Sequence, residues 1–249
     1  MQLANGLTML DITATMMGRV NTICPTLLWD EQNLVLVDTG YPGQLPLFRE
    51  ALEKAGHPFE KLTKIIATHQ DIDHIGSLSD MLTAAPRKIE VLATEADKPY
   101  IQGEKMLIKV TPEAIARALA ALSADMPEEQ RQAFKHRLEN PPRANVDTTL
   151  ADGEALPYGG GVIVIHTPGH TPGHLCLYHP GSKTLIAADA LAVGESGLVR
   201  SRAFDFDTKL AAKSLEKLAQ YDIETVICYH GGLYRGDANR HIAELAAEA

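Results

Sequence analysis

The sequence is poor in cysteine, and this shortage excludes two common kinds of small-protein scaffold. Among its 249 residues there are three cysteines, Cys24, Cys176 and Cys228, and none of them belongs to a Cys-x-x-Cys pair. Neither a disulfide framework nor a zinc knuckle is indicated. We therefore expect reduced, buried thiols, which favour a cytoplasmic location.

Clustered positive charge and long apolar runs are also missing. The formal net charge is -9, and no group of Lys and Arg is dense enough to bind a phosphate backbone. No apolar run reaches the roughly 20 residues that span a bilayer, and the first residues lack the basic and apolar regions of a signal peptide. We expect a cytoplasmic protein that acts on a small molecule, without nucleic acid or membrane partners, as a monomer or homodimer.

Apolar, β-branched segments alternate with amphipathic ones along the chain. Segments 20–29 and 34–38 predict a hairpin, and later apolar runs predict further strands at 64–68, 89–93, 162–166, 175–178, 184–188 and 225–228. Helices are expected before about residue 55 and at about 75–82, 210–218 and 238 onward. Because each half of the chain has its own strands and helices, we expect a single α/β domain, 1–249, with two facing sheets and helices outside.

A helical pair interrupts this pattern at about 103–140. Thr111-Pro112-Glu113 predicts a helix start, and Pro141-Pro142 ends the second helix. We expect the pair to cover a cleft and to form an apolar substrate pocket; the alternative is that its apolar side chains complete its own small core. The candidate lining residues are Met106, Leu107, Ile108 and Phe134, with Met16 and Met17 facing them.

The densest group of chemically active side chains lies in the segment 68–76, directly after an expected strand. It contains His69, Asp71, Asp73 and His74. In an extended segment residues two apart point the same way, so the first three side chains can converge. Imidazole with carboxylate suits zinc, iron or manganese, whereas the alternative is a polar loop that caps the next helix.

Three more residues of ligand type follow expected strands. His170 lies in a turn-rich run after the strand 162–166, Asp189 follows the strand 184–188, and His230 follows the strand 225–228. Loops at strand ends are where functional sites are usually assembled. The repeated coincidence predicts that these residues join the earlier group.

The combined pattern resembles the metallo-β-lactamase superfamily, with its His-x-His-x-Asp-His motif followed by a distant His, Asp and His. The run Thr-Pro-Gly-His-Thr-Pro-Gly-His at 167–174 is especially similar to quorum-quenching lactonases and glyoxalase II-type thioesterases. The resemblance implies a four-layer αββα sandwich. It also implies that one metal is held by His69, Asp71 and His170, a second by Asp73, His74 and His230, and that Asp189 bridges them.

The chemistry implied by this resemblance is metal-dependent hydrolysis. Two divalent metal ions, with zinc favoured and manganese or iron as alternatives, would clamp a hydroxide that cleaves a carboxyl ester, lactone or thioester. Asp73 is the candidate catalytic residue as well as a ligand. Other activities of the same fold stay open: a β-lactam hydrolase, a mononuclear-iron sulfur oxidoreductase and a nuclease, besides a non-catalytic metal-binding protein.

The sequence departs from the family at two positions. Asp71 stands where the motif has its second His. Its oxygen reaches as far as the nearer ring nitrogen, so we expect it to bind metal; the alternative is that this metal site is lost. Its charge favours harder metals such as manganese or iron. Ala192 stands where the lactonases carry a Tyr, and Tyr229 is a weak substitute. Asp38 is expected to have a structural or an orienting role, and His174 to orient the ligands by hydrogen bonds, with a plain role in the core as the alternative.

Overall fold

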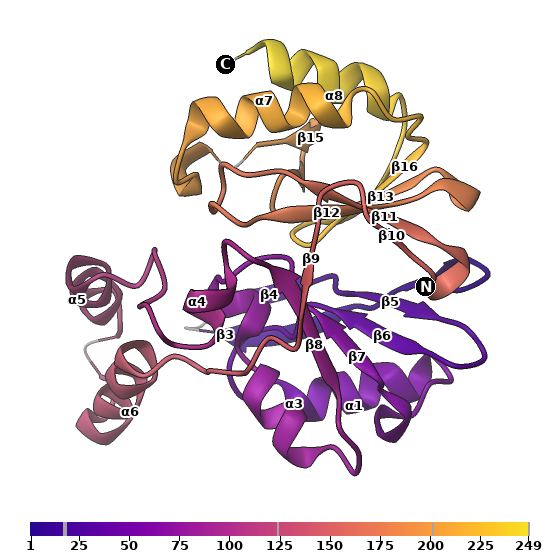
Figure 1. Cartoon of the computed structure of the whole chain (residues 1–249). Helices are drawn as coiled ribbons and strands as arrows, with labels where there is room; N and C mark the ends of the chain where they lie inside the picture. Colours follow the sequence, from indigo (N-terminus) through magenta and orange to yellow (C-terminus); the bar gives the residue numbers. More distant parts are fainter. Residues whose placement is uncertain (17–18, 124, 201, 249) are drawn as a thin grey trace.

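The computed structural model describes residues 1–16, 19–123, 125–200 and 202–248, without the side chains of Met16 and Arg19. Two β-sheets pack face to face, and helices cover the outer face of each sheet (Figure 1). The predicted four-layer αββα arrangement is therefore confirmed. Within the described residues, no helix combines the length and the apolar character that crossing a membrane requires.

The first sheet is built from the N-terminal half of the chain and has the order β1-β2-β5-β6-β7-β8-β9. Strands β6 to β9 run parallel, and the others pair antiparallel. Helices α1 (Leu45–Lys54) and α3 (Leu78–Ala84) lie on its outer face (Figure 1). Its strands are β1 (Gln2–Ala4), β2 (Leu7–Met9), β5 (Thr26–Trp29), β6 (Leu34–Val37), β7 (Lys64–Ile66), β8 (Glu90–Thr94) and β9 (Thr148–Leu150).

The second sheet comes from the C-terminal half and has the order β10-β11-β12-β13-β16-β17. Only β13 and β16 pair in parallel. Helices α7 (Thr208–Leu218) and α8 (Ala238–Ala247) cover its outer face (Figure 1). Its strands are β10 (Ala155–Leu156), β11 (Val162–His166), β12 (Leu175–His179), β13 (Thr184–Ala188), β16 (Thr225–Cys228) and β17 (Gly232–Arg235).

Smaller elements surround the sheets. Two separate ribbons pair β3 (Ile12–Met16) with β4 (Arg19–Ile23) and β14 (Ala192–Gly194) with β15 (Gly197–Val199). Short helices are α2 (Ile72–Ile75) and α4 (Lys98–Ile101). Single 3-10 turns lie at Phe59–Lys61, Tyr158–Gly160, Pro180–Ser182 and Arg202–Phe204.

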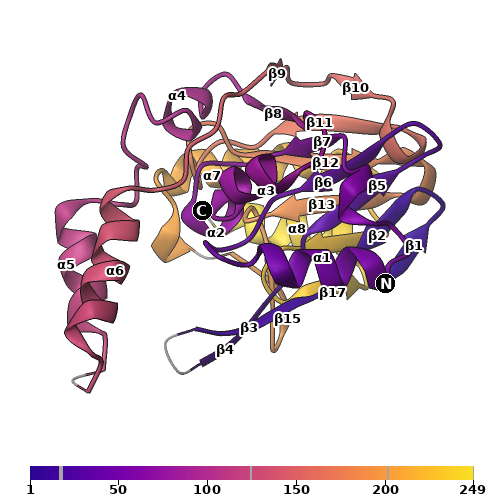
Figure 2. The ribbon, with the colours of Figure 1, turned by 90° about the horizontal axis from the view of Figure 1, so that it is seen from below.

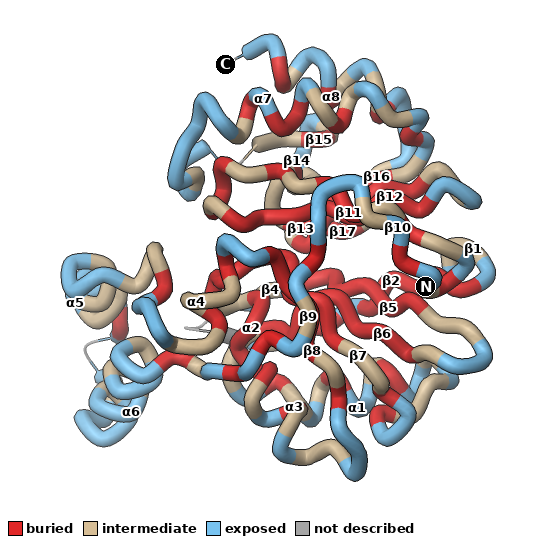
Figure 3. Tube along the Cα trace, viewed as in Figure 1, coloured by how far each residue is buried: buried red, intermediate tan, exposed pale blue. Residues whose placement is uncertain are grey.

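Burial explains why the central strands are almost wholly apolar. Every residue of β6, β12 and β13 is buried, because each of these strands has the other sheet on one side and helices on the other. Side chains such as Val35, Ile66, Val164 and Leu177 fill the space between the sheets. Figure 3 shows this buried interior and the exposed outer surfaces of the helices.

Two predicted elements differ from the structure. The expected strand 20–29 is two strands, because Pro25 offers no amide hydrogen to a sheet; β4 pairs with β3, while β5 pairs with β2 and β6. The expected helix 75–82 is also two helices, α2 and α3. Gly76 lies between them and donates its amide hydrogen to Gly40 at 2.7 Å, and a Cβ atom there would lie 2.5 Å from the same carbonyl oxygen.

The expected helical pair is present as α5 (Pro112–Ala120) and α6 (Glu128–Glu139). The two helices pack against each other at one side of the molecule, as Figure 2 shows from below. Neither helix contains a fully buried residue. The predicted core of the pair is therefore shallow, which leaves its apolar side chains free to line a cavity.

Candidate metal centre

All seven predicted ligands lie at one place, near strand ends of both sheets. His69 lies shortly after β7, and His170 lies on the turn between β11 and β12. Asp189 directly follows β13, and His230 lies two residues beyond β16. Because β13 and β16 are parallel neighbours, their ends deliver Asp189 and His230 to the same edge of the sheet.

The convergence of the first segment has a different cause from the predicted one. The alternation of an extended chain does not apply, because helix α2 begins at Ile72 and contains Asp73 and His74. Asp71 is the last extended residue before this helix, with φ −62° and ψ 146°. A short extended stretch followed by one helical turn brings His69, Asp71, Asp73 and His74 to the same centre.

Four residues form a compact group, here called the second cluster: Asp73, His74, Asp189 and His230. One possible ligand atom from each lies within 4.8 Å of the others. Nε2 of His230 is 3.2 Å from Oδ2 of Asp73, and Nε2 of His74 is 3.2 Å from Oδ1 of Asp189. Ligands about 2.0–2.1 Å from a tetrahedral zinc ion are separated by about 3.3 Å, so this spacing suits a metal ion.

One possible ligand atom each of His69, His170 and Asp189 also lies within 4.8 Å of the others, and Asp71 lies beside them. Oδ2 of Asp71 is 3.3 Å from Nε2 of His69 and 3.1 Å from Nε2 of His170. We call these four residues the first cluster. Asp71 is not within the mutual 4.8 Å group, so it stands at the edge of the cluster rather than in its middle.

Hydrogen bonds turn the lone pairs of two histidines toward the centre. Oδ2 of Asp38 lies 2.8 Å from Nδ1 of His74 and accepts its hydrogen, because a carboxylate can only accept. Thr68 donates its hydroxyl to Asp38 and accepts from Nδ1 of His69 at 3.0 Å. Both rings therefore point Nε2 toward the centre, where a bound metal would take the place of a hydrogen on that atom.

The residues present fit a bound cation. Nε2 of His69, Nε2 of His74 and Oδ1 of Asp189 are buried and have no hydrogen-bond partner among the described residues. Burial alone would lower the pKa of His74, but Asp189, Asp38 and Asp73 raise it well above its usual value. The pKa of Asp189 is held well below its usual value by His74 and His69, against the effect of burial. The clusters thus favour positive charge at their centre.

Backbone strain is concentrated beside these groups. Asp38 and Ala188 both have positive φ, 67° and 45°, which costs a non-glycine residue about 1–3 kcal/mol. Ala188 directly precedes Asp189 and lies at an irregularity in the pairing of β13 with β16. The surrounding sheet holds this conformation, and the result is the position of the Asp189 carboxylate between the two clusters.

Two residues that the sequence did not single out as site residues support the loops. Asp97 is fully buried and accepts four hydrogen bonds: from the backbone and side-chain amides of Gln70, the hydroxyl of Thr171 and the amide of Gly173. It therefore ties the loop of His69 to the loop of His170. Asp205 faces Nδ1 of His170 at 3.5 Å.

His174 has the orienting position predicted for it. It is fully buried, its Nδ1 lies 2.8 Å from the hydroxyl of Thr167, and its Nε2 accepts the amide hydrogen of Asp189 at 3.2 Å. The turn before it depends on Gly169, whose φ is 138° and where a Cβ atom would lie 2.2 Å from the backbone nitrogen of Ala211. No other residue fits there without moving α7.

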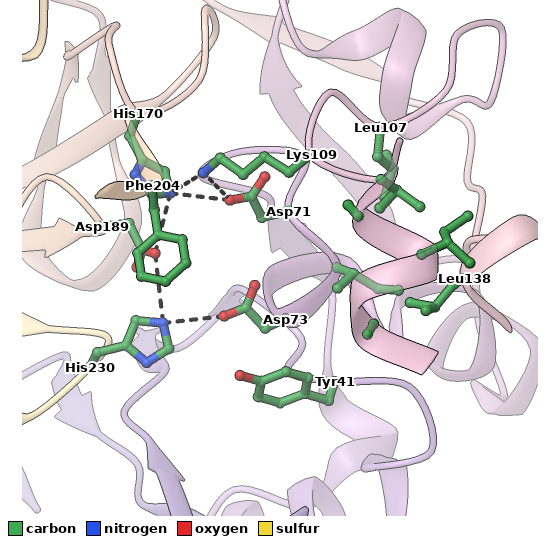
Figure 4. Close-up of a pocket in the computed structure, with 15 residues that line it drawn as sticks. Tyr41, Asp71, Asp73, Leu107, Lys109, Leu138, His170, Asp189, Phe204 and His230 are labelled. Atoms are coloured by element: carbon green, nitrogen blue, oxygen red, sulfur yellow. Dashed lines mark hydrogen bonds and ion pairs between the residues drawn. The ribbon is translucent and has the colours of Figure 1, made fainter. Parts of the chain in front are cut away.

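Lys109 is a further site residue that the sequence did not reveal. It belongs to the segment before α5, and its side chain reaches the first cluster, as Figure 4 shows. Nζ of Lys109 lies 2.5 Å from Oδ2 of Asp71 and 2.6 Å from Nε2 of His170. Asp71 therefore has a cation beside it, and its pKa is held well below its usual value by His69, His170 and Lys109, against burial.

A cavity of about 470 Å³ joins the two clusters to the helical pair. Its polar end has Asp71, Asp73, His170, Asp189 and His230, and its other side is apolar (Figure 4). The apolar lining comes mainly from the inserted segment: Leu107, Val110, Ala114, Ile115, Ala118 and Leu138.

The predicted pocket is thus present, but only part of its predicted lining is right. Leu107 lines this cavity, whereas Met106 and Ile108 line a neighbouring one and Phe134 lines neither. The interior side of α6 presents Leu138 instead. Met17 and the side chain of Met16 lie outside the described residues.

The tyrosines near the site have different positions from those expected. Tyr229 is buried and stacks on His74, and its hydroxyl donates to the backbone oxygen of Asp73 at 2.6 Å, so it faces away from the cavity. Tyr41 lines the cavity, and its hydroxyl accepts from the amide of Asn21 at 3.1 Å. Burial and the nearby Asp73 raise the pKa of Tyr41, so its hydroxyl keeps its hydrogen.

A sandwich of two sheets between helices, with His and Asp clusters at the strand ends, defines the class of protein. The model of the Metallo-beta-lactamase superfamily matches residues 25–230, and the chain belongs to this superfamily. The region matched runs from the start of β5 to His230. It contains both clusters and the helical pair.

Individual relatives share a smaller part of their sequence with this chain. The chain is 28% identical over 215 residues to the probable metallo-hydrolase YflN of Bacillus subtilis (strain 168), covering 81% of this chain and 76% of that protein. It is 41% identical over 91 residues to a hydroxyacylglutathione hydrolase of Rhizobium etli, covering 36% of this chain and 33% of that enzyme.

Solved structures support the fold over the whole chain. A metallo-beta-lactamase family protein of Thermus thermophilus superimposes with a TM-score of 0.71 at 27% identity, covering 99% of this chain and 80% of that one. A metallo-beta-lactamase from Pontibacter korlensis gives a TM-score of 0.69 at 16% identity, covering 100% and 98%. The second likeness shows the fold alone.

Proposed function

We propose that this member of the superfamily hydrolyses a carboxyl ester, lactone or thioester of a small molecule that carries an apolar acyl group. The cavity carries this proposal, because it places two clusters of metal-ligand type at one end and apolar side chains at the other. Enclosure by apolar groups with a few polar ones is typical of small-molecule sites.

The cofactors in this proposal are two divalent metal ions, one in each cluster, with zinc favoured. His69, Asp71 and His170 would hold the first ion, Asp73, His74 and His230 the second, and Asp189 would lie between them. Manganese or iron are the alternatives, because three carboxylates suit harder metals. When bound, such metals supply a nucleophile from water at neutral pH and polarise a carbonyl group.

The chain's own residues would act as follows. Asp73 is the proposed catalytic residue: it lines the cavity and would accept the proton of the attacking water. Tyr41 lines the same cavity with a protonated hydroxyl, which would donate a hydrogen bond to the carbonyl oxygen of the substrate. The apolar residues of the inserted segment would hold the acyl group and exclude bulk water.

Thioester hydrolysis is favoured by one of the comparisons. The 41% identity to the hydroxyacylglutathione hydrolase of Rhizobium etli is confined to 91 residues, a third of that enzyme. The helical pair supplies an apolar wall, so an acyl thioester with an apolar chain fits this site better than a short polar one. A cytoplasmic location and the absence of nucleic acid and membrane partners stay predictions.

The test is a substrate panel on purified, zinc-, manganese- or iron-loaded protein: acyl lactones, acyl esters, acyl thioesters, a β-lactam and single-stranded RNA. We expect hydrolysis of at least one of the first three classes. Asp73→Asn should lower kcat by about 10²–10⁴-fold, the usual range for a general acid or base. Hydrolysis of RNA or β-lactam alone would replace the proposal by a nuclease or a β-lactam hydrolase.

A matched control uses the exposed Asp80 on α3, whose variant Asp80→Asn should retain full activity. If metal-loaded protein hydrolyses none of the substrates but consumes a sulfur substrate with oxygen, the chain is an oxidoreductase. If it binds metal and acts on no substrate, it is a metal-binding protein and the proposed function is wrong.

A further inference from the structure

The side chain of Lys109 carries a positive charge and contacts two of the expected metal ligands of the first cluster. Nζ of Lys109 is 2.5 Å from Oδ2 of Asp71 and 2.6 Å from Nε2 of His170. Dashed lines in Figure 4 mark both contacts. Only 27% of the Lys109 side chain is exposed, against 10% for Asp71 and 4% for His170, so water screens these contacts poorly.

The two atoms that Lys109 contacts, Oδ2 of Asp71 and Nε2 of His170, are the atoms that would face a metal ion in the first cluster. Zinc would lie about 2.0–2.2 Å from them, so the ammonium nitrogen is only about 0.5 Å farther away. Nε2 of a neutral imidazole has one lone pair, which can accept a hydrogen bond or bind a metal, but not both. The ammonium group and a metal ion therefore exclude each other at His170.

We propose that Lys109 competes with the metal ion for the first cluster, so that the chain binds one divalent metal tightly in the second cluster and another only when Lys109 is displaced. The inference rests on the metal binding assumed in the proposed function. In the metal-poor state the ammonium group takes over the charge that an ion would supply. The two clusters then differ in affinity, although their ligands are alike.

The second cluster has no such competitor. Its residues Asp73, His74, Asp189 and His230 have no contact with a Lys or Arg side chain among the ion pairs of the described residues. Nε2 of His74 and Oδ1 of Asp189 have no hydrogen-bond partner there. An ion entering this cluster displaces no cation, which is why we assign it the higher affinity.

Asp71 gives the exchange a physical basis. A carboxylate attracts an ammonium group, whereas the neutral imidazole found in the family motif would offer it only a single hydrogen bond. The negative charge of Asp71 can therefore bind either the ammonium group of Lys109 or a metal ion. The competition that we propose thus depends on both Asp71, which departs from the motif, and Lys109, which contacts it.

The backbone of Lys109 is fixed, so that release of the ammonium group requires only rotation of the side chain. The amide of the preceding residue, Ile108, donates to Oε1 of Gln70 at 2.8 Å, and Gln70 is itself held by Asp97. Val110, on the other side, lines the cavity. A displaced Lys109 side chain would remain within the cavity, close to a bound substrate.

The decisive experiment is a zinc titration of the metal-free wild type and of metal-free Lys109→Met. Calorimetry measures the affinities, and native mass spectrometry counts the bound ions. We expect two zinc ions of unequal affinity in the wild type. In Lys109→Met the weaker site should become about 10- to 100-fold tighter, the range for losing charge-assisted hydrogen bonds that compete with the ion. The tighter site should change by less than about threefold.

A control and a second readout guard against indirect effects. Lys105→Met removes an exposed lysine of the same segment and should leave both affinities unchanged. Acetylation of the wild type should modify Lys109 slowly until the second equivalent of zinc is added and rapidly afterwards, while Lys105 reacts at a constant rate. Circular dichroism of both variants verifies that they fold.

The outcomes separate this inference from the proposed function. Equal zinc affinities in wild type and folded Lys109→Met, with two ions bound by each, would overturn the role of Lys109 and leave the metal site standing. Binding of no zinc, manganese or iron by either protein would overturn both proposals. Acetylation of Lys109 that is independent of zinc would also contradict the competition.

Discussion

Oδ2 of Asp38 lies 2.8 Å from Nδ1 of His74, although the two residues are 36 positions apart in the chain. The carboxylate is almost fully buried and also accepts hydrogen bonds from the amide and hydroxyl of Thr68. It thereby fixes which nitrogen of His74 carries hydrogen. The left-handed backbone of Asp38 is the local cost of this arrangement.

Removing this carboxylate should weaken the second cluster. In Asp38→Ala the ring of His74 can rotate or change tautomer, and we expect metal affinity to fall about 10- to 100-fold, as for other groups that orient metal ligands. Competition with a chromophoric chelator measures this change. Asp80→Asn is the control, and an unchanged affinity in a folded Asp38→Ala would show that His74 is held by other contacts.

The sequence reveals the site residues because they follow strong apolar strands. The strands leading to His69, Asp189 and His230 are apolar after their first residue, so their ends could be located without the structure. Strands such as β9 and β10 have three and two residues, too few to show a period, and they were not predicted. Strands inside apolar segments were predictable, including the three-residue β7, whereas the short edge strands β9 and β10 were not.

Lys109 and Asp97 could not be found in this way. Lys109 lies 38 residues from Asp71 and 61 from His170, and nothing in the apolar segment around it, Met106 to Val110, shows which distant groups its ammonium group will contact. Asp97 meets Gln70 and Gly173 across 27 and 76 residues, and looks like any acidic residue in a loop. Their roles exist only once the two sheets have packed together, which is a property of the tertiary structure.

Asp97 should be a major source of stability. Asp97→Ala would leave four donors from Gln70, Thr171 and Gly173 without their acceptor in a fully buried position. We expect a loss of about 2–4 kcal/mol in the free energy of unfolding, since each buried unsatisfied group costs about 1–3 kcal/mol and relaxation recovers part of the cost. Urea unfolding of the metal-free protein measures it.

Asp97→Asn provides the matched variant. It keeps one acceptor oxygen but replaces the other by an amide that cannot accept the hydrogen of Gly173 or Gln70. We therefore expect a smaller loss than in Asp97→Ala. Equal stability of wild type and Asp97→Ala would mean that the two loops are held together without this residue.

The three cysteines should be unreactive in the folded protein. Cys24, Cys176 and Cys228 are free and buried, as expected from their small and odd number. Burial raises the pKa of Cys24 and of Cys176 to about 12, and raises the pKa of Cys228 well above its usual value. At pH 8 the native protein should release no thionitrobenzoate from Ellman's reagent, whereas the unfolded protein should release three equivalents; rapid native labelling would contradict this burial.

Tyr41 should contribute to the proposed reaction through its hydroxyl. Tyr41→Phe retains the ring that lines the cavity but removes the hydrogen that would bond to the substrate carbonyl. We expect kcat to fall about 10²-fold, at the lower end of what one such donor supplies, with KM changed by less than about threefold. Tyr221→Phe is the control, because Tyr221 does not line the cavity. An unchanged kcat in Tyr41→Phe would show that Tyr41 does not stabilise the carbonyl oxygen of the substrate in the reaction.

The helical pair should set the length of the acyl group. Ile115 on α5 and Leu138 on α6 line the cavity at its apolar side, opposite the two clusters. Ile115→Trp adds bulk there and should shift the preference toward shorter acyl chains, with kcat/KM for long chains falling about tenfold or more, as 1–3 kcal/mol per misplaced group predicts. A series of acyl substrates of increasing length measures the shift.

Phe134→Ala serves as the comparison, because Phe134 lines neither cavity and its loss should lower kcat/KM for all chain lengths alike, if at all. A shift caused by Phe134→Ala but not by Ile115→Trp would place the acyl group on the other side of α6.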